Sequence, residues 1–89
     1  MSTFVKDPDA KLDYSIDWSG WLPEGDSVLN STWSVPAGLT KHDESLGAGV
    51  ATVWLSGGLD RQRYEVTNRI TTAAGRIDER TITLDARQR

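Results

Sequence analysis

Apolar and polar residues alternate along much of this chain, and the alternation is clearest near its start. From Leu12 to Ser19, a run of eight residues, the even positions are apolar and the odd positions are Asp or Ser. A period of two kept over such a run indicates a β-strand with one buried face. Gly20 ends the pattern, and Pro23 and Gly25 exclude a regular central strand in the connection that follows.

The same period predicts four further strands, within residues 28–35, 50–55, 64–72 and 77–86. The side chains expected to point inward from three of them are Leu29, Trp33, Val35, Ala51, Val53, Leu55, Ile82, Leu84 and Ala86. Between the last two strands, residues 73–76 predict a hairpin turn because they include a glycine that tolerates positive φ.

Residues 39–49 are less regular than the rest of the chain. Leu39 and Leu46 are the apolar residues that would hold a short edge strand on the core, and Gly47 and Gly49 flank a turn. This stretch therefore predicts at most a sixth or seventh strand.

No segment has helical periodicity, so the pattern predicts an all-β fold. We expect one antiparallel β-sandwich of about six to seven strands, immunoglobulin-like or fibronectin III-like, over residues 11–89. Tyr64, which opens a strand feeding a tight hairpin, is placed to form a tyrosine corner. Residues 1–10 are expected to be an extended N-terminal arm, with Phe4 and Val5 as the residues that hold it in place.

Composition narrows the class of protein. A chain of 89 residues is one domain at most, and the absence of cysteine points to a reducing compartment. No apolar run approaches the roughly 20 residues of a membrane span, and the N-terminus lacks signal-peptide features, so we expect a soluble product made inside a cell without a membrane partner. The net charge of −3 argues mildly against nucleic acid as a partner.

Candidate catalytic or metal-binding chemistry is sparse. His42, with Asp43 and Glu44, has no second histidine or cysteine to complete a metal site, and adjacent residues on an extended chain face opposite ways, so a solvated loop is the preferred interpretation. Ser56 and Ser45 lack the sequence context of an activated nucleophile. We therefore predict no catalytic residue, no metal and no cofactor.

The four tryptophans divide into two groups. Trp18 and Trp33 have the parity of the core and are expected to pack between the sheets. Trp54 has the opposite parity from its buried neighbours, and Trp21 lies in a connection. Because exposed tryptophans are enriched at binding surfaces, Trp54 and Trp21 are predicted to contact a partner.

Three segments carry a resemblance to a known family. They are residues 13–18 (DYSIDW), 53–58 (VWLSGG) and 67–72 (TNRITT). Over about Lys6 to Leu84 the chain resembles small virion proteins of tailed bacteriophages and prophages, the phage fibre–tail adaptor proteins. None of the three segments is a catalytic signature, so the resemblance implies a structural part of a particle and not an enzyme.

The resemblance also implies the setting of the protein. We expect it in the virion, assembled in the host bacterial cytoplasm as several copies in a symmetric assembly, against tail, connector or fibre proteins. An extended arm and strand edges are natural joints in such assemblies, because added strands supply directional main-chain hydrogen bonds.

Other functions stay open at this point. The same sandwich suits a capsid decoration or head-fibre base protein, and Trp21 with Trp54 would suit a small carbohydrate-binding module if they formed one stacking platform. An enzyme is the least favoured alternative. The residues predicted to form a protein interface are Phe4, Val5, Trp21 and Trp54.

Overall fold

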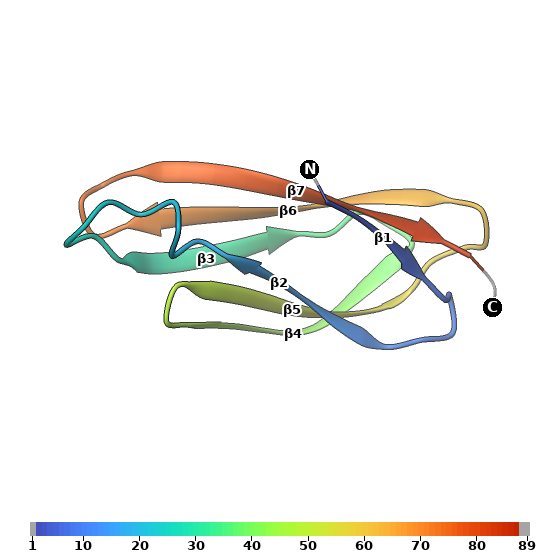
Figure 1. Ribbon diagram of the computed structural model, residues 1–89. Helices are drawn as coiled ribbons and strands as arrows, with labels where there is room; N and C mark the ends of the chain where they lie inside the picture. The colour runs from blue at the N-terminus through green and yellow to red at the C-terminus, as the bar shows by residue number, and fades with distance from the viewer. Residues whose placement is uncertain (1, 88–89) are drawn as a thin grey trace.

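The computed structural model describes residues 2–87, which form seven strands in two sheets, joined by turns and loops (Figure 1). The strands are β1 (Ser2–Lys6), β2 (Leu12–Asp17), β3 (Val28–Ser34), β4 (Leu39–Gly47), β5 (Val50–Gly57), β6 (Arg63–Thr72) and β7 (Ile77–Ala86). Met1, Gln88 and Arg89, which the expected arm and domain include, lie outside the described residues.

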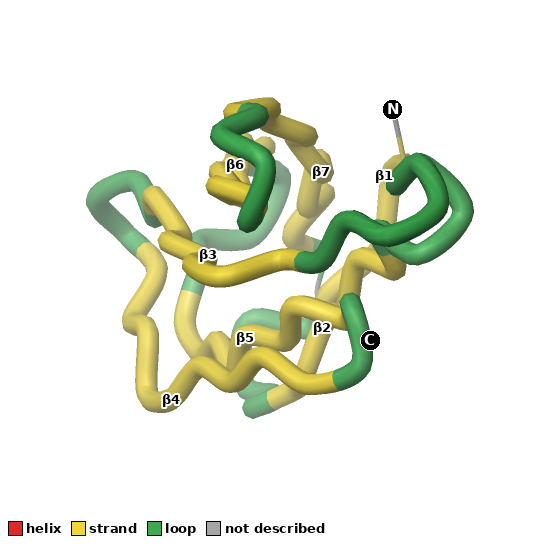
Figure 2. Tube along the Cα trace, turned by 90° about the vertical axis from the view of Figure 1, so that its left-hand side faces the viewer, coloured by secondary structure: helices red, strands yellow, loops and turns green. Residues whose placement is uncertain are grey.

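The two sheets pack face to face as the layers of a sandwich (Figures 1 and 2). One has the strand order β1-β7-β6-β3 and the other β2-β5-β4, and the molecule measures 44 × 22 × 19 Å. The predicted all-β sandwich is confirmed. Within residues 2–87 no helix is long and apolar enough to cross a membrane.

One strand pairing departs from the antiparallel pattern. β1 runs parallel to β7, from Ser2 beside Ile82 to Lys6 beside Ala86, whereas every other pair among the described strands is antiparallel. Residues 2–6 thus form an edge strand on their own domain, and the chain then crosses through a turn at Asp7 to enter the opposite sheet.

The alternation seen in the sequence places one face of each sheet in the core. Trp18 and Trp33 are both buried, as predicted. The buried hydrophobic residues are Tyr14, Ile16, Trp18, Trp33, Ala51, Val53, Leu55, Tyr64, Val66, Ile70, Ile82, Leu84 and Ala86. Val35, Leu39 and Trp21 are partly buried against this core.

Leu29 is not part of the core, and the prediction that it points inward was wrong. Its side chain is 64% exposed, while Val28 packs against the core. The cause is a β-bulge: Val28 pairs with Thr72, but Asn30 already pairs with Thr71, so Leu29 is an extra residue in β3. Beyond a bulge, the residues that pointed inward by simple alternation point outward, and the alternation alone does not reveal where the bulge occurs.

Residues 39–47 form the full edge strand β4, longer than the short strand expected there. The turn between Gly47 and Gly49 is confirmed, with positive φ at Ala48 and Gly49. The solvated loop expected at His42 is replaced by strand, because a register shift between Lys41 and Asp43 makes His42 an exposed bulge residue within β4. Charged side chains and a bulge are common protections of a strand edge against pairing with another chain.

The tyrosine corner is confirmed. The Leu59 backbone N–H donates to the Tyr64 hydroxyl at 2.9 Å, across the connection from β5 to β6. Gly38 makes room for this ring, because a Cβ at that position would lie 2.8 Å from Tyr64 Cε1. Gly38 also has a φ of 103°, which favours glycine.

A buried polar network joins the two sheets. Trp18 Nε1 donates to Asn68 Oδ1 at 2.8 Å, and Asn68 Nδ2 donates to Ser31 Oγ at 2.8 Å and to the Thr32 carbonyl at 3.0 Å. The Arg80 guanidinium carbon lies 4.3 Å from the centroid of the Trp18 ring. We call Trp18, Asn68, Ser31 and Arg80 the Trp18 cluster.

Candidate functional site

Trp54 lies on the outer face of the sheet β2-β5-β4, in its central strand. Its side chain is 40% exposed, whereas Val53 and Leu55 on either side point into the core and are fully buried. The residues directly opposite Trp54 on the two neighbouring strands are Asp13 in β2 and Asp43 in β4. Cross-strand neighbours have Cβ atoms about 4.5–5.5 Å apart, so both carboxylates flank the indole.

A hollow of about 560 Å³ adjoins the Trp54 ring and is lined by Lys11, His42, Asp43 and Trp54. These side chains, together with Asp13, form what we call the Trp54 surface. The bulge in β4 turns His42 toward this face, where its Nε2 forms a hydrogen bond with Ser56 Oγ. The sheet thus presents one large aromatic ring surrounded by charged and hydrogen-bonding groups.

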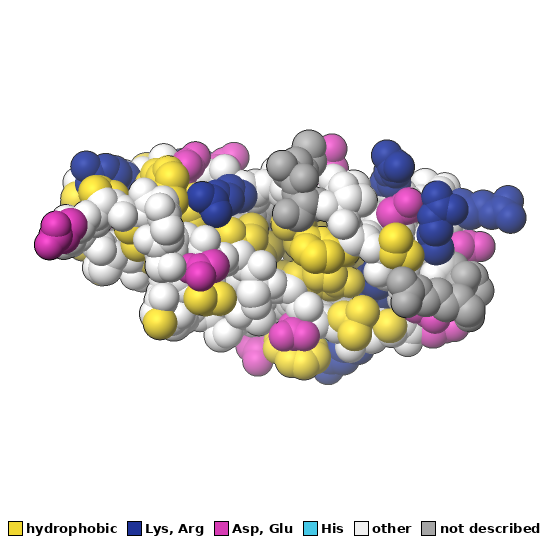
Figure 3. Space-filling model, viewed as in Figure 1, with side chains coloured by type: hydrophobic (Ala, Val, Ile, Leu, Met, Phe, Trp, Pro, Cys, Tyr) yellow, Lys and Arg dark blue, Asp and Glu magenta, His cyan; other side chains and the backbone are white. Residues whose placement is uncertain are grey.

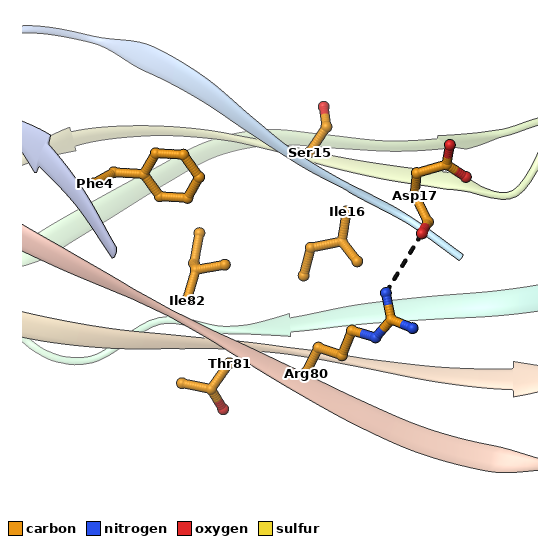
Figure 4. A pocket seen from close by; sticks show the side chains of 7 residues that line it. All are labelled: Phe4, Ser15, Ile16, Asp17, Arg80, Thr81 and Ile82. Atoms are coloured by element: carbon orange, nitrogen blue, oxygen red, sulfur yellow. Dashed lines mark hydrogen bonds between the residues drawn. The ribbon is translucent and has the colours of Figure 1, made fainter. Parts of the chain in front are cut away.

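A second hollow, of about 680 Å³, lies between β2 and β7, which belong to different sheets, and beside Phe4 of β1. Seven residues line it: Phe4, Ser15, Ile16, Asp17, Arg80, Thr81 and Ile82. Figure 4 shows Phe4, Ile16 and Ile82 facing one another, with Arg80 Nη1 donating to the Asp17 carbonyl at 3.4 Å. In Figure 3, apolar side chains gather near the middle of the face on which β1 and β2 lie.

The residues predicted to form an interface occupy separate places. Phe4 is 39% exposed and its ring lies 5.4 Å from that of Tyr14, while Val5 is exposed on the same strand. Trp21 is half-buried and packs edge-on against Trp18, with the ring centroids 5.5 Å apart. Since Trp21 is held at the core and Trp54 lies on the outer face of a sheet, they do not combine into one platform.

Lys6 holds the N-terminal strand in place, a role that the sequence pattern did not indicate. It is only 1% exposed, and its Nζ donates to the carbonyls of Asp7, Ala10 and Gly57 at 2.9, 2.6 and 2.9 Å. Burial lowers the Lys6 pKa, against the opposing effect of the nearby Asp7 and Asp9 carboxylates. The sequence offered one signal, a lysine two residues beyond Phe4 and therefore on the same side of the strand.

The structure also brings together side chains that the sequence left apart. His42 and Ser56 are hydrogen-bonded although they lie 14 residues apart. In the same strand as His42, the Asp43 carboxylate accepts a local hydrogen bond from the backbone N–H of the adjacent Glu44 at 2.9 Å. Among residues 2–87 no group of three or more His, Cys, Asp or Glu side chains is placed to hold a metal ion.

The comparison with protein families decides the identity of the chain. Residues 6–85 match the family described as podophage GP4 fiber-tail adaptor protein gp77. The chain belongs to this family. The resemblance predicted over Lys6 to Leu84 is thereby confirmed. The comparison with curated proteins gave no match.

The match to the fiber-tail adaptor family covers most of the features described above. It includes strands β2 to β6 in full, the whole Trp18 cluster and the whole Trp54 surface. Phe4 and Val5 precede the matched residues, whereas Lys6 is the first of them. The Trp54 surface is therefore the exposed candidate surface that lies entirely within the region shared with the adaptor family.

Proposed function

We propose that this chain is a non-enzymatic virion adaptor that joins the tail region of a podophage particle to fibres or neighbouring virion proteins. The observation that carries the proposal is the family match over residues 6–85. The structure supports it because two layers packed into a small sandwich leave outer sheet faces and strand edges available for neighbours. On this proposal the protein resides in the virion, assembles in the host cytoplasm and occurs as several symmetric copies.

We also infer an immunoglobulin-like arrangement of the strands. With the strands lettered A to G in chain order, the sheets read A-G-F-C and B-E-D. Immunoglobulin domains likewise hold B, E and D in one sheet and C, F and G in the other. The tyrosine corner at Tyr64 adds a second feature of that fold.

The adaptor has two surfaces suited to neighbours. The Trp54 surface offers an exposed aromatic ring, and exposed Trp is enriched among residues that dominate binding energy. The hollow beside Phe4 offers apolar side chains at a sheet edge, with Val5 exposed on the same strand. Trp21 would contribute through its exposed part only, because it also packs against Trp18.

A test is to replace Trp54 in the parent phage and to measure the fibre content of purified particles. We expect Trp54→Thr particles to carry less adaptor and fewer fibres than wild type, since the ring is the central contact of the proposed interface. Leu29→Thr is the matched control, because Leu29 is also an exposed apolar residue but lies in the other sheet. Particles in which neither variant changes adaptor or fibre content would exclude the Trp54 surface as the joint.

The position of the chain in the particle tests the broader proposal. Electron microscopy of the wild-type particle should place a small number of copies in a ring near the tail. Copies spread over the capsid lattice would instead favour the capsid decoration or head-fibre base function. A particle without this chain would contradict the adaptor proposal itself.

A further inference from the structure

We propose that the Trp54 surface binds an arginine side chain of a partner protein, whose guanidinium stacks on the indole and pairs with Asp13 and Asp43. This inference rests on the proposed adaptor function and gives the chemistry of one of its joints. It follows from the exposed ring, the two flanking carboxylates and the adjoining hollow.

The hydrophobic core of the sandwich does not include the Trp54 ring. Its strand neighbours on the outer face are Thr52 and Ser56, which suit a solvated sheet face, and the Ser15 hydroxyl pairs with that of Thr52 at 2.8 Å across to β2. A threonine at position 54 would satisfy the same backbone with less exposed apolar area. The large ring in the centre of an otherwise polar face therefore points to a contact outside this chain.

The charges beside the ring favour a cation. Asp13 and Asp43 lie directly opposite Trp54 on its two sides, and neither forms an ion pair with a Lys or Arg within residues 2–87. The face of an indole is negative, so a ring between two carboxylates attracts positive charge from both sources. A neutral sugar would use the stacking surface and leave both charges without a counterion.

An arginine fits this arrangement better than a lysine. A guanidinium is planar, stacks on aromatic rings and can donate two parallel hydrogen bonds to one carboxylate. The same chain already contains such a pair, in which the exposed Arg80 stacks on the buried Trp18 ring and also donates to the Asp17 carbonyl. The Trp54 surface has the ring and the two carboxylate acceptors, and a partner protein would supply the guanidinium.

Lys11 lines the same hollow and therefore provides a test of the charge of the ligand. Its positive charge offsets part of the attraction of Asp13 and Asp43 for an incoming cation. Removing this charge should strengthen the binding of a cationic partner and weaken that of an anionic one. Lys11 thus distinguishes between ligands of opposite charge without altering the ring.

The test is a titration followed by NMR through the indole N–H resonance of Trp54, with the peptide acetyl-Thr-Arg-Thr-amide as the probe. The peptides with Lys or Glu at the central position and methyl glucoside are the comparisons. We expect a saturable shift with the Arg peptide, a weaker one with Lys and none with Glu or the glucoside. The Asp13→Asn/Asp43→Asn variant should bind the Arg peptide about fivefold more weakly, as expected for two exposed ion pairs.

Two further readouts complete the test. Lys11→Ala should tighten the Arg peptide about twofold, and raising the salt from about 0.05 to 0.5 M should weaken it, since exposed charges are screened. Glu65→Gln is the matched control, an exposed carboxylate on the other sheet whose loss should leave binding unchanged. An Arg peptide that does not shift the resonance, binding unaffected by the double Asp variant, or saturable binding of the glucoside would overturn the inference.

Failure here can be told apart from failure of the adaptor function. If Trp54→Thr particles lose fibres while the Arg peptide does not bind, the joint exists but its partner chemistry is not arginine. If the Arg peptide binds as expected while Trp54→Thr particles keep their adaptor and fibres, the surface binds cations but is not the joint proposed above.

Discussion

The Trp18 cluster and the Trp54 surface each place polar or charged side chains around a tryptophan, but one tryptophan is buried and the other is exposed. Trp18 is fully buried, its N–H donates to Asn68 and its ring carries the Arg80 guanidinium. Trp54 is 40% exposed, and the carboxylates beside it form no ion pair within residues 2–87. In the Trp18 cluster the indole N–H and the Asn68 amide form hydrogen bonds within the chain. At the Trp54 surface the ring and the carboxylates face solvent.

The difference separates stability from binding. A buried group that loses its hydrogen-bond partner incurs a desolvation penalty, so changes in the Trp18 cluster act on folding. An exposed group keeps its hydration when its neighbour is removed, so changes at the Trp54 surface are expected to leave folding largely intact. If the Trp54 surface is the joint proposed above, it can be altered without unfolding the domain.

The largest effect is expected for Trp18→Ala. The substitution removes a fully buried ring and leaves the Asn68 Oδ1 without its donor, so we expect a loss of about 3–5 kcal/mol in the free energy of unfolding. A domain this small has limited stability, and the variant is expected to be at least partly unfolded at 37 °C, as far-ultraviolet circular dichroism would show.

A milder pair of variants isolates the hydrogen bond. Trp18→Phe removes the donor to Asn68, whereas the Nε1 of the buried Trp33 has no hydrogen-bond partner among residues 2–87, so Trp33→Phe leaves no acceptor unpaired. We expect Trp18→Phe to lower the urea midpoint further than Trp33→Phe does. Equal midpoints would show that the network contributes nothing beyond ring packing.

The next largest effect is expected for Lys6→Met, which tests a second buried polar group whose hydrogen-bond partners lie within the chain. The change keeps an apolar side chain in place but removes the donor of three carbonyl groups, so we expect a loss of about 1–3 kcal/mol in chemical denaturation. Lys11→Met is the matched control because Lys11 is exposed, and it should change stability by less than about 0.5 kcal/mol. If the two variants were equally stable, Lys6 would not be what holds β1.

A smaller, pH-dependent effect is expected for Asp26, whose side chain is 3% exposed and ties the loop before β3 to the β6–β7 hairpin. Desolvation pushes the Asp26 pKa upward, but hydrogen bonds from Thr72, Ala74, Ser27 and Arg76 outweigh it and lower the pKa. A carboxyl group with a lowered pKa in the folded state adds stability above its unfolded pKa of 3.8, and this stability is lost as the pH falls through the folded value.

The urea midpoint of the wild type should therefore fall as the pH is lowered from about 5 to 3. Asp26→Asn should be less stable than wild type at pH 7 and should show a shallower decline over the same interval. A variant whose midpoint declines as steeply as that of the wild type would show that Asp26 is not a source of the acid sensitivity.

These sites also show which parts of the structure the sequence could predict. Periodicity placed Trp18, Trp33 and Trp54 on the correct sides, because each strand alternates strictly where it has no bulge. It misplaced Leu29, because an extra residue in β3 depends on pairing with β6 and leaves no mark in the local pattern. It also missed the role of Lys6, because the three carbonyls that stabilise a buried ammonium come together only in the folded chain.

The candidate surface was predictable only in part, for the same reason. The parity of Trp54 indicated exposure, but the register that sets Asp13 and Asp43 on its two sides joins three strands from distant parts of the sequence. The pairing of His42 with Ser56 likewise depends on the bulge in β4. The exposure of Trp54 could be predicted from the pattern of one strand, whereas the positions of the charges around it depend on how three strands pair.

Apart from the Lys11→Met control, the smallest effect on stability is expected for Trp54→Thr. The substitution removes a partly exposed ring from a solvated sheet face and replaces it with a residue of high β-propensity, so the free energy of unfolding should change by less than about 1 kcal/mol. Urea denaturation of Trp54→Thr beside Trp18→Ala measures the contrast directly, because both changes truncate a tryptophan. A loss at Trp54 as large as that at Trp18 would mean that its ring stabilises the sheet β2-β5-β4, and any loss of fibres in Trp54→Thr particles would then report unfolding. A small loss would leave binding as the reason for an exposed tryptophan between two aspartates.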